Sequence, residues 1–195
     1  MEPLPASAEA LELLAVSGDE DLGARAAWVA ETLAEVVPQA DAVAIWFADE
    51  DLTLVLVDPL AEVSRRVVDP VMRSSLALRL ATSTRVISVV TIYSERVDVF
   101  AGRVSAVERA VGAVWGASVV DGDLAFDALQ SAELAPAQLR ARLVIDTAVG
   151  LLVGTRGLSI DEAEDWLDHV SRTGGHTALE VATQVLAARS WPDGA

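Results

Sequence analysis

The chain has 195 residues, and 30 acidic against 14 basic side chains give it a formal net charge of −16. Most of such a surface repels a polyanion, which excludes broad, non-specific affinity for nucleic acid or for an anionic membrane. All fourteen of those basic residues are arginine, and cysteine is absent. The chain therefore has no P-loop lysine, no Schiff-base lysine, no disulfide and no thiol nucleophile.

Hydrophobic residues make up 52% of the chain, which is enough to bury a sizeable core. The longest uncharged interior stretch, residues 110–120, is too short to cross a bilayer. The first five residues carry an acid and no positive charge, unlike a secretory signal. We therefore expect a cytoplasmic protein with no membrane partner.

Three segments frame the first half of the chain. Residues 1–20 are rich in Ala and Glu and are predicted to be a flexible lead-in. Apolar residues at steps of three and four predict amphipathic helices over 22–36 and 104–118. The apolar seams of these two helices are candidates for a homodimer interface.

Between those helices, apolar and β-branched runs predict two hairpins. The first pairs 42–47 with 52–57, and the second pairs 75–80 with 86–93. Helices packed on an antiparallel sheet form an α+β domain, which we place at 21–121.

The remainder of the chain is predicted to contain helices and no strands. A helical linker is predicted over 122–135, and Pro136 is expected to open a new helix. Two capping boxes, Ser159 with Glu162 and Thr177 with Glu180, are predicted to begin two further helices. This predicts a three-helix domain over 136–190, followed by a short tail at 191–195.

Small and apolar residues recur at matching positions of these three helices: Arg142, Ile145, Ala148, Gly150, Leu152, Leu158, Ser159, Glu162, Ala163, Leu167, Leu179, Val181 and Ala182. This pattern resembles the ANTAR domain, a three-helix RNA-binding module of bacterial transcription antitermination regulators. The resemblance implies binding of a paired-hairpin RNA, usually as a dimer, so that a terminator does not form. Positions that fit the pattern and would serve RNA binding include Arg142, Ala148 and Gly150.

The second hairpin, with Tyr93, Ser94 and Phe100 after it, looks like the closing hairpin of a GAF domain, which is a sensory fold. GAF followed by ANTAR is a known pairing. The resemblance implies that a small molecule or a protein signals to the first domain. The aromatic residues Trp46, Tyr93, Phe100 and Trp115 line a ligand cavity in this interpretation, or simply pack in the core.

Three positions depart from the ANTAR pattern. Val149 replaces a basic residue, Glu164 an aromatic residue, and Asp168 an arginine. Because stacking and phosphate contacts bind RNA, these changes favour an alternative in which the domain keeps its fold and no longer binds RNA. DNA binding through a helix-turn-helix is a weaker alternative, since the last helix is poor in base-reading groups.

The arginines of the first ANTAR-like helix supply the remaining attraction for RNA. Residues 136–157 contain Arg140, Arg142 and Arg156 against the single acid Asp146. These arginines either contact phosphates or form a solvated helix face with local ion pairs. Trp166 is expected in the core rather than as a stacking platform, and His169 and His176 as cap or surface residues.

Catalytic and metal-binding patterns are missing from the sequence. There is no G-x-S-x-G elbow and no H-E-x-x-H helix, and the glycines from Gly150 to Gly157 lack the strand and lysine of a phosphate loop. The acidic turn 49–51 is expected to be solvated rather than to hold a cation. The sequence thus predicts a regulator that is not an enzyme and uses no metal or cofactor.

Overall fold

The computed structural model describes residues 1–17, 20–60, 72–82 and 85–189. The chain divides into two compact units, residues 1–136 and 137–195. The first unit is built on an antiparallel sheet, and the second is helical in its described part. This confirms the predicted α+β class.

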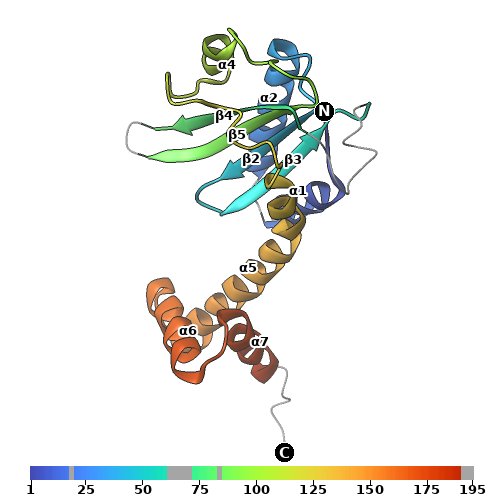
Figure 1. Ribbon diagram of the computed structural model, residues 1–195. Coiled ribbons are helices and arrows are strands. Elements are labelled where there is room, and N and C mark those ends of the chain that lie inside the picture. The colour runs from blue at the N-terminus through green and yellow to red at the C-terminus, as the bar shows by residue number, and fades with distance from the viewer. Residues whose placement is uncertain (18–19, 61–71, 83–84, 190–195) are drawn as a thin grey trace, which may run out of the picture. The chain divides into compact units, whose positions relative to one another are not determined.

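The described part of the first unit contains a six-stranded sheet in the order β1-β3-β2-β5-β4-β6, with all neighbours antiparallel (Figure 1). Its strands are β1 (Glu2–Pro3), β2 (Ala42–Phe47), β3 (Leu52–Val57), β4 (Ser74–Ala81), β5 (Val86–Ser94) and β6 (Val119–Val120). Pairing of β2 with β3 and of β4 with β5 confirms both predicted hairpins. Continuous apolar runs indicated β2 and β3, whereas alternation of apolar and polar residues indicated β4.

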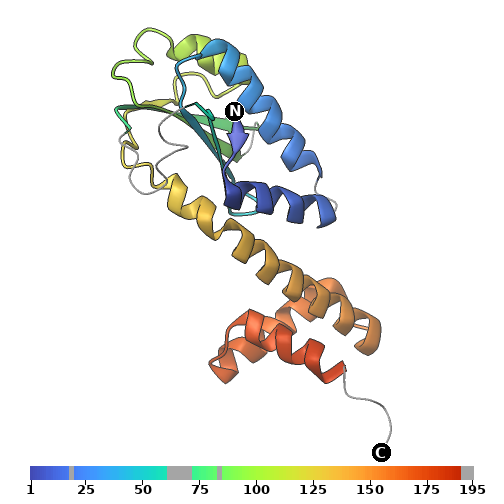
Figure 2. The ribbon, with the colours of Figure 1, turned by 90° about the vertical axis from the view of Figure 1, so that its right-hand side faces the viewer.

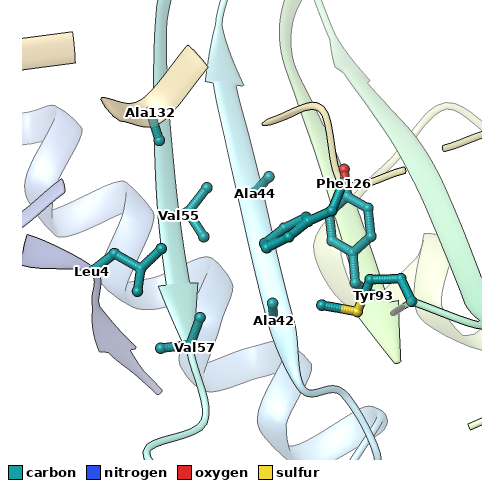
Figure 3. Close-up of a cluster of buried hydrophobic side chains, with 9 residues drawn as sticks. Leu4, Ala42, Ala44, Val55, Val57, Tyr93, Phe126 and Ala132 are labelled. Carbon is teal, nitrogen blue, oxygen red and sulfur yellow. The ribbon is translucent and has the colours of Figure 1, made fainter. Parts of the chain in front are cut away.

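Both faces of the central strands are covered. On one face, alternate residues of β2 and β3 pack with Tyr93, Phe126 and Ala132 (Figure 3). The opposite face carries buried residues such as Ile45 and Leu54, and α2 (Glu20–Val36) lies along that face (Figure 2). Covering on both sides explains why β3 is buried along its whole length.

The expectation of a flexible lead-in is wrong for the first seventeen residues. Residues 2 and 3 form β1, and α1 (Pro5–Ser17) follows with Leu14 buried. Val55 in β3 accepts a hydrogen bond from the N–H of Leu4 at 3.0 Å and donates one to Ser7 Oγ at 2.8 Å. This segment is ordered because it satisfies backbone groups that the edge of β3 would otherwise leave unpaired.

The predicted helix 104–118 is shorter than its periodicity indicates. The helix α4 (Val104–Val111) ends at Gly112, which has a φ of 66° and donates its N–H to the carbonyl of Glu108. The valine pattern continues past Gly112, but a glycine in the left-handed conformation is a common helix end. Val107 and Val111 are buried inside the unit.

The two helical seams do not form the free interface that we expected from the sequence. The helices α2 and α4 contact each other, and Leu33, Val107 and Val111 are each less than 5% exposed. A side chain already buried in its own unit offers no surface to a second copy. The seams therefore stabilise the first unit, and a dimer interface must use other residues.

Pro136 does not open a new helix. Instead α5 runs without interruption from Ala128 to Arg156, with Pro136 inside it. An internal proline removes one helical hydrogen bond, yet the helix continues through it, and the neighbouring Ala132 and Ala135 are buried. The predicted linker helix and the first ANTAR-like helix are thus one element.

Two further helices complete the second unit, α6 (Ile160–Gly174) and α7 (Ala178–Arg189). With the end of α5 they enclose a core of small and branched side chains: Ala148, Val149, Leu152, Ala163, Leu167, Val181 and Ala182. Among the described residues, no single helix is long and apolar enough to cross a membrane, and only α5 and α6 taken as a bent pair meet that test.

Candidate nucleic-acid interface

Both predicted capping boxes are confirmed. Ser159 Oγ accepts the N–H of Glu162 at 3.3 Å, and the Glu162 carboxylate accepts the N–H of Ser159 at 2.8 Å. Thr177 and Glu180 make the same exchange at 3.2 and 2.8 Å. Hydrogen bonds to the charged form hold the pKa of Glu162 and of Glu180 below the usual 4.5. These boxes fix where α6 and α7 begin relative to the end of α5.

The three candidate arginines lie on two sides of α5. Arg142 and Arg156 are fourteen residues apart, nearly four helical turns, so they share one side about 21 Å apart along the axis. Arg140 is about 200° around the helix from Arg142. Arg142 and Arg156 therefore share one side of α5, and Arg140 does not lie on that side.

Arg142 and Arg156 have different partners. Arg142 is exposed and pairs with Asp146 at 4.0 Å, one turn along the same helix. The guanidinium carbon of Arg156 lies 4.8 Å from the ring centroid of Trp166 on α6, a cation–π contact. An exposed i,i+4 pair is worth only about 0.3–0.5 kcal/mol, so Arg142 can exchange its carboxylate for a phosphate.

Ala148 and Gly150 are two positions apart and face different surroundings. Ala148 is fully buried in the helical core, so its methyl group contributes to packing and is not available to RNA. Gly150 is exposed, and a Cβ added there would meet nothing within 4 Å. The packing of this unit does not require glycine at 150, which leaves that helix face bare.

A groove opens beside the Arg156–Trp166 contact, between the end of α5, α6 and α7. Its volume is about 390 Å³, within the range of small-ligand sites. Mostly apolar side chains line it, together with Thr155, Arg156 and Gln184. We call this feature the Arg156–Trp166 groove.

The family model of the ANTAR domain matches residues 134–186. These residues form an ANTAR domain. No curated protein and no solved structure matched the chain in the corresponding comparisons. The matched range covers most of α5, all of α6 and most of α7, close to the predicted 136–190.

The three departures from the ANTAR pattern have different structural consequences. Val149 is 6% exposed and packs in the core of the ANTAR domain. Glu164 and Asp168 are exposed, and Asp161 and Asp165 lie on the same side of α6, which defines an acidic strip. One departure thus adds to packing, whereas two add negative charge to the surface of the domain.

Trp166 is both a core and a surface residue of the ANTAR domain. It packs against the buried core cluster, as predicted, yet it also lines the groove beneath Arg156. The sequence interpretation missed this second role because Arg156 and Trp166 lie on different helices. His169 and His176 are exposed, and His176 Nδ1 is 3.8 Å from the Glu180 carboxylate.

The structure shows how the acidic turn and the candidate aromatic residues of the first unit are placed. Asp49 in the acidic turn pairs with Arg85 through two hydrogen bonds of 2.9 and 3.0 Å, and Asp51 accepts one from the Trp46 indole at 3.1 Å. Tyr93 is buried, whereas Trp115 is 82% exposed. The four candidate aromatic residues therefore do not surround one cavity.

Proposed function

We propose that this chain binds RNA hairpins through its ANTAR domain and controls transcription antitermination. The match of residues 134–186 to the ANTAR domain, a regulatory RNA-binding module, carries this proposal. Arg142 and Arg156, both on one side of α5, supply the attraction to phosphate, and the exposed Gly150 lets RNA approach that helix closely. Arg140 contacts phosphate from the other side of the helix.

We further propose that the first unit is a GAF-like sensory domain. An antiparallel sheet with helices on it, over 21–121, is compatible with that fold. In this proposal, a small molecule or a protein signals to the unit. The continuous helix α5 then connects the unit directly to the ANTAR domain, in place of the predicted separate linker 122–135 and a new helix at 136. The protein acts in the cytoplasm as a homodimer.

The salt dependence of RNA binding tests the proposed function. Fluorescence anisotropy with a labelled two-hairpin RNA should show affinity that falls as salt rises, because counterions are released on binding. Arg142→Ala should weaken binding and reduce the salt slope by about one unit. If the full chain shows no affinity above background at low salt, the proposed function fails. An unchanged slope in the variant would place the phosphate contact elsewhere.

The acidic strip on α6 favours a second candidate function, a sensory or protein-interaction module whose ANTAR domain no longer binds RNA. The four carboxylates of this strip, Asp161, Glu164, Asp165 and Asp168, repel a polyanion on that side of the domain. In this case RNA affinity is absent under every salt and ligand condition. Light scattering against a 20.5 kDa monomer then shows whether the chain still forms a homodimer.

A further inference from the structure

The Arg156–Trp166 groove combines groups that recognise a flat heterocycle. Three features of its wall matter: a cation held over an aromatic ring, apolar side chains such as Val170 and Val185, and polar groups from Thr155 and Gln184. Among the described residues that line it, Arg156 is the one charged side chain. A ligand with a large charge of its own would find only one partner there, whereas a neutral aromatic ring fits both the walls and the cation.

The polar groups of the groove suit the edge of a nucleobase. Thr155 donates its hydroxyl hydrogen to the carbonyl of Leu151 at 2.7 Å, so its oxygen remains as an acceptor. Gln184 carries both an amide donor and a carbonyl acceptor. A nucleobase needs a π surface and mixed donors and acceptors at its edge, and unpaired bases stack on aromatic side chains or on guanidinium planes.

Two carboxylates of the acidic strip face away from the groove, whereas Glu162, one turn before Trp166, lies on the same side of α6 as Trp166. Glu164 and Asp168 are each two residues from Trp166, which places them about 160° to 200° around the helix from it. A polyanionic chain can therefore bring one base to Trp166 without its phosphates passing over those two carboxylates. The cation Arg156 is the charged side chain among the described residues that line the groove, which favours RNA over a basic peptide as the partner at this site.

We propose that the Arg156–Trp166 groove receives one unpaired base from the loop of an RNA hairpin. The base stacks on the Arg156 guanidinium, and Thr155 and Gln184 contact its edge. This inference rests on the proposed RNA binding and adds a base-specific site to the phosphate contacts. It also gives Trp166 a role that compensates for the stacking group lost at Glu164.

A pair of charge-conserving variants tests the base site. Arg156→Lys keeps the positive charge and removes the planar guanidinium. The matched control is Arg172→Lys on α6, because Arg172 is exposed and lies outside the proposed RNA contacts. The probe is a two-hairpin RNA with 2-aminopurine at one loop position at a time, along with the same RNA made abasic at that position. The full chain is used for affinity, for 2-aminopurine fluorescence and for circular dichroism as the measure of folding.

At one loop position, we expect Arg156→Lys to weaken binding at least about fivefold, with an unchanged salt slope, and to abolish the fluorescence change. Arg172→Lys should leave both the affinity and the fluorescence change nearly as in the original chain. Abasic RNA should bind the original chain and Arg156→Lys equally, because the stacking partner is gone.

Two results would overturn the base site while the proposed function survives. In the first, RNA binds but both lysine variants lose the same affinity at every loop position. In the second, Arg156→Lys changes the oligomeric state in light scattering without changing RNA affinity, which makes the groove an interface between copies. Complete absence of RNA affinity in the original chain removes the proposed function and the base site together.

Discussion

Tyr93 donates its phenolic hydrogen bond to the carboxylate of Asp123, and this bond joins β5 to the segment that leads into α5. The Tyr93 ring also meets Phe126 edge-on, with centroids 4.5 Å apart. Phe126 has a φ of 58°, an unfavourable conformation for a bulky residue that tertiary packing maintains. The start of α5 is thus anchored to the sheet by a buried polar and aromatic contact.

The contact of Tyr93 with Asp123 and Phe126, which we call the anchor, predicts that the free energy of unfolding falls at high pH. Burial and the neighbouring Asp123 raise the pKa of Tyr93 above its usual 10.0. Because the folded pKa is raised, the stabilisation is fully present below pH 10.0 and is lost as pH rises beyond it. Tyr93 is the single tyrosine, so ultraviolet difference absorbance of tyrosinate reports this group alone.

We expect tyrosinate to form only together with unfolding in the original chain. Tyr93→Phe keeps the ring contact with Phe126 and should cost about 1.5–3 kcal/mol at neutral pH, measured by urea unfolding, since a hydrogen bond to a charged group is lost. Tyrosinate formation in a chain that is still folded would contradict the anchor.

The capping boxes predict a loss of helix at low pH. The pKa of Glu162 is depressed by its bonds to Ser159, so its contribution is present above pH 4.5 and is lost as pH falls through the folded value. Ser159→Ala should destabilise the ANTAR domain by about 1 kcal/mol. Glu162→Gln keeps an acceptor and should flatten the acid dependence of helicity in circular dichroism. A Gln variant with the same acid profile as the original would assign that dependence to other carboxylates.

Replacement of Gly150 by alanine is expected to raise the stability of α5 and to lower RNA affinity. Because a Cβ at 150 meets nothing within 4 Å, Gly150→Ala should stabilise α5 by about 0.5–1 kcal/mol in thermal unfolding. The same methyl group stands on the bare face where RNA is proposed to approach, so affinity should fall while stability rises. Unchanged RNA affinity in this more stable variant would remove Gly150 from the interface.

Replacement of Val149 by arginine is expected to strengthen RNA binding. Positions 142, 149 and 156 are seven residues apart and lie on one side of α5, so Val149 lies between Arg142 and Arg156, where it is now buried. Val149→Arg can keep its aliphatic stem in the core and extend its charge to the surface. We expect tighter RNA binding and a salt slope steeper by about one unit. The uncharged control is Val149→Met, and an Arg variant that folds but binds no better than Met would remove this side of α5 from the RNA interface.

Local patterns in the sequence determined the two hairpins, the α+β class and the capping boxes of α6 and α7. These features depend on residues close together in the chain: alternation along β4, or Ser159 three positions before Glu162. The same kind of evidence identified the ANTAR domain, because its small and apolar residues recur at fixed spacings. No partner from a distant segment was needed for these assignments.

Tertiary structure decided the features in which distant residues compete with a local signal. The edge of β3 orders residues 1–17, α5 continues through Pro136, and burial of the two seams removes the expected dimer surface. The site shows the same division. The sequence named Arg156 and Trp166 separately, but only the packing of α5 against α6 brought the cation over the ring, because that contact joins residues on different helices.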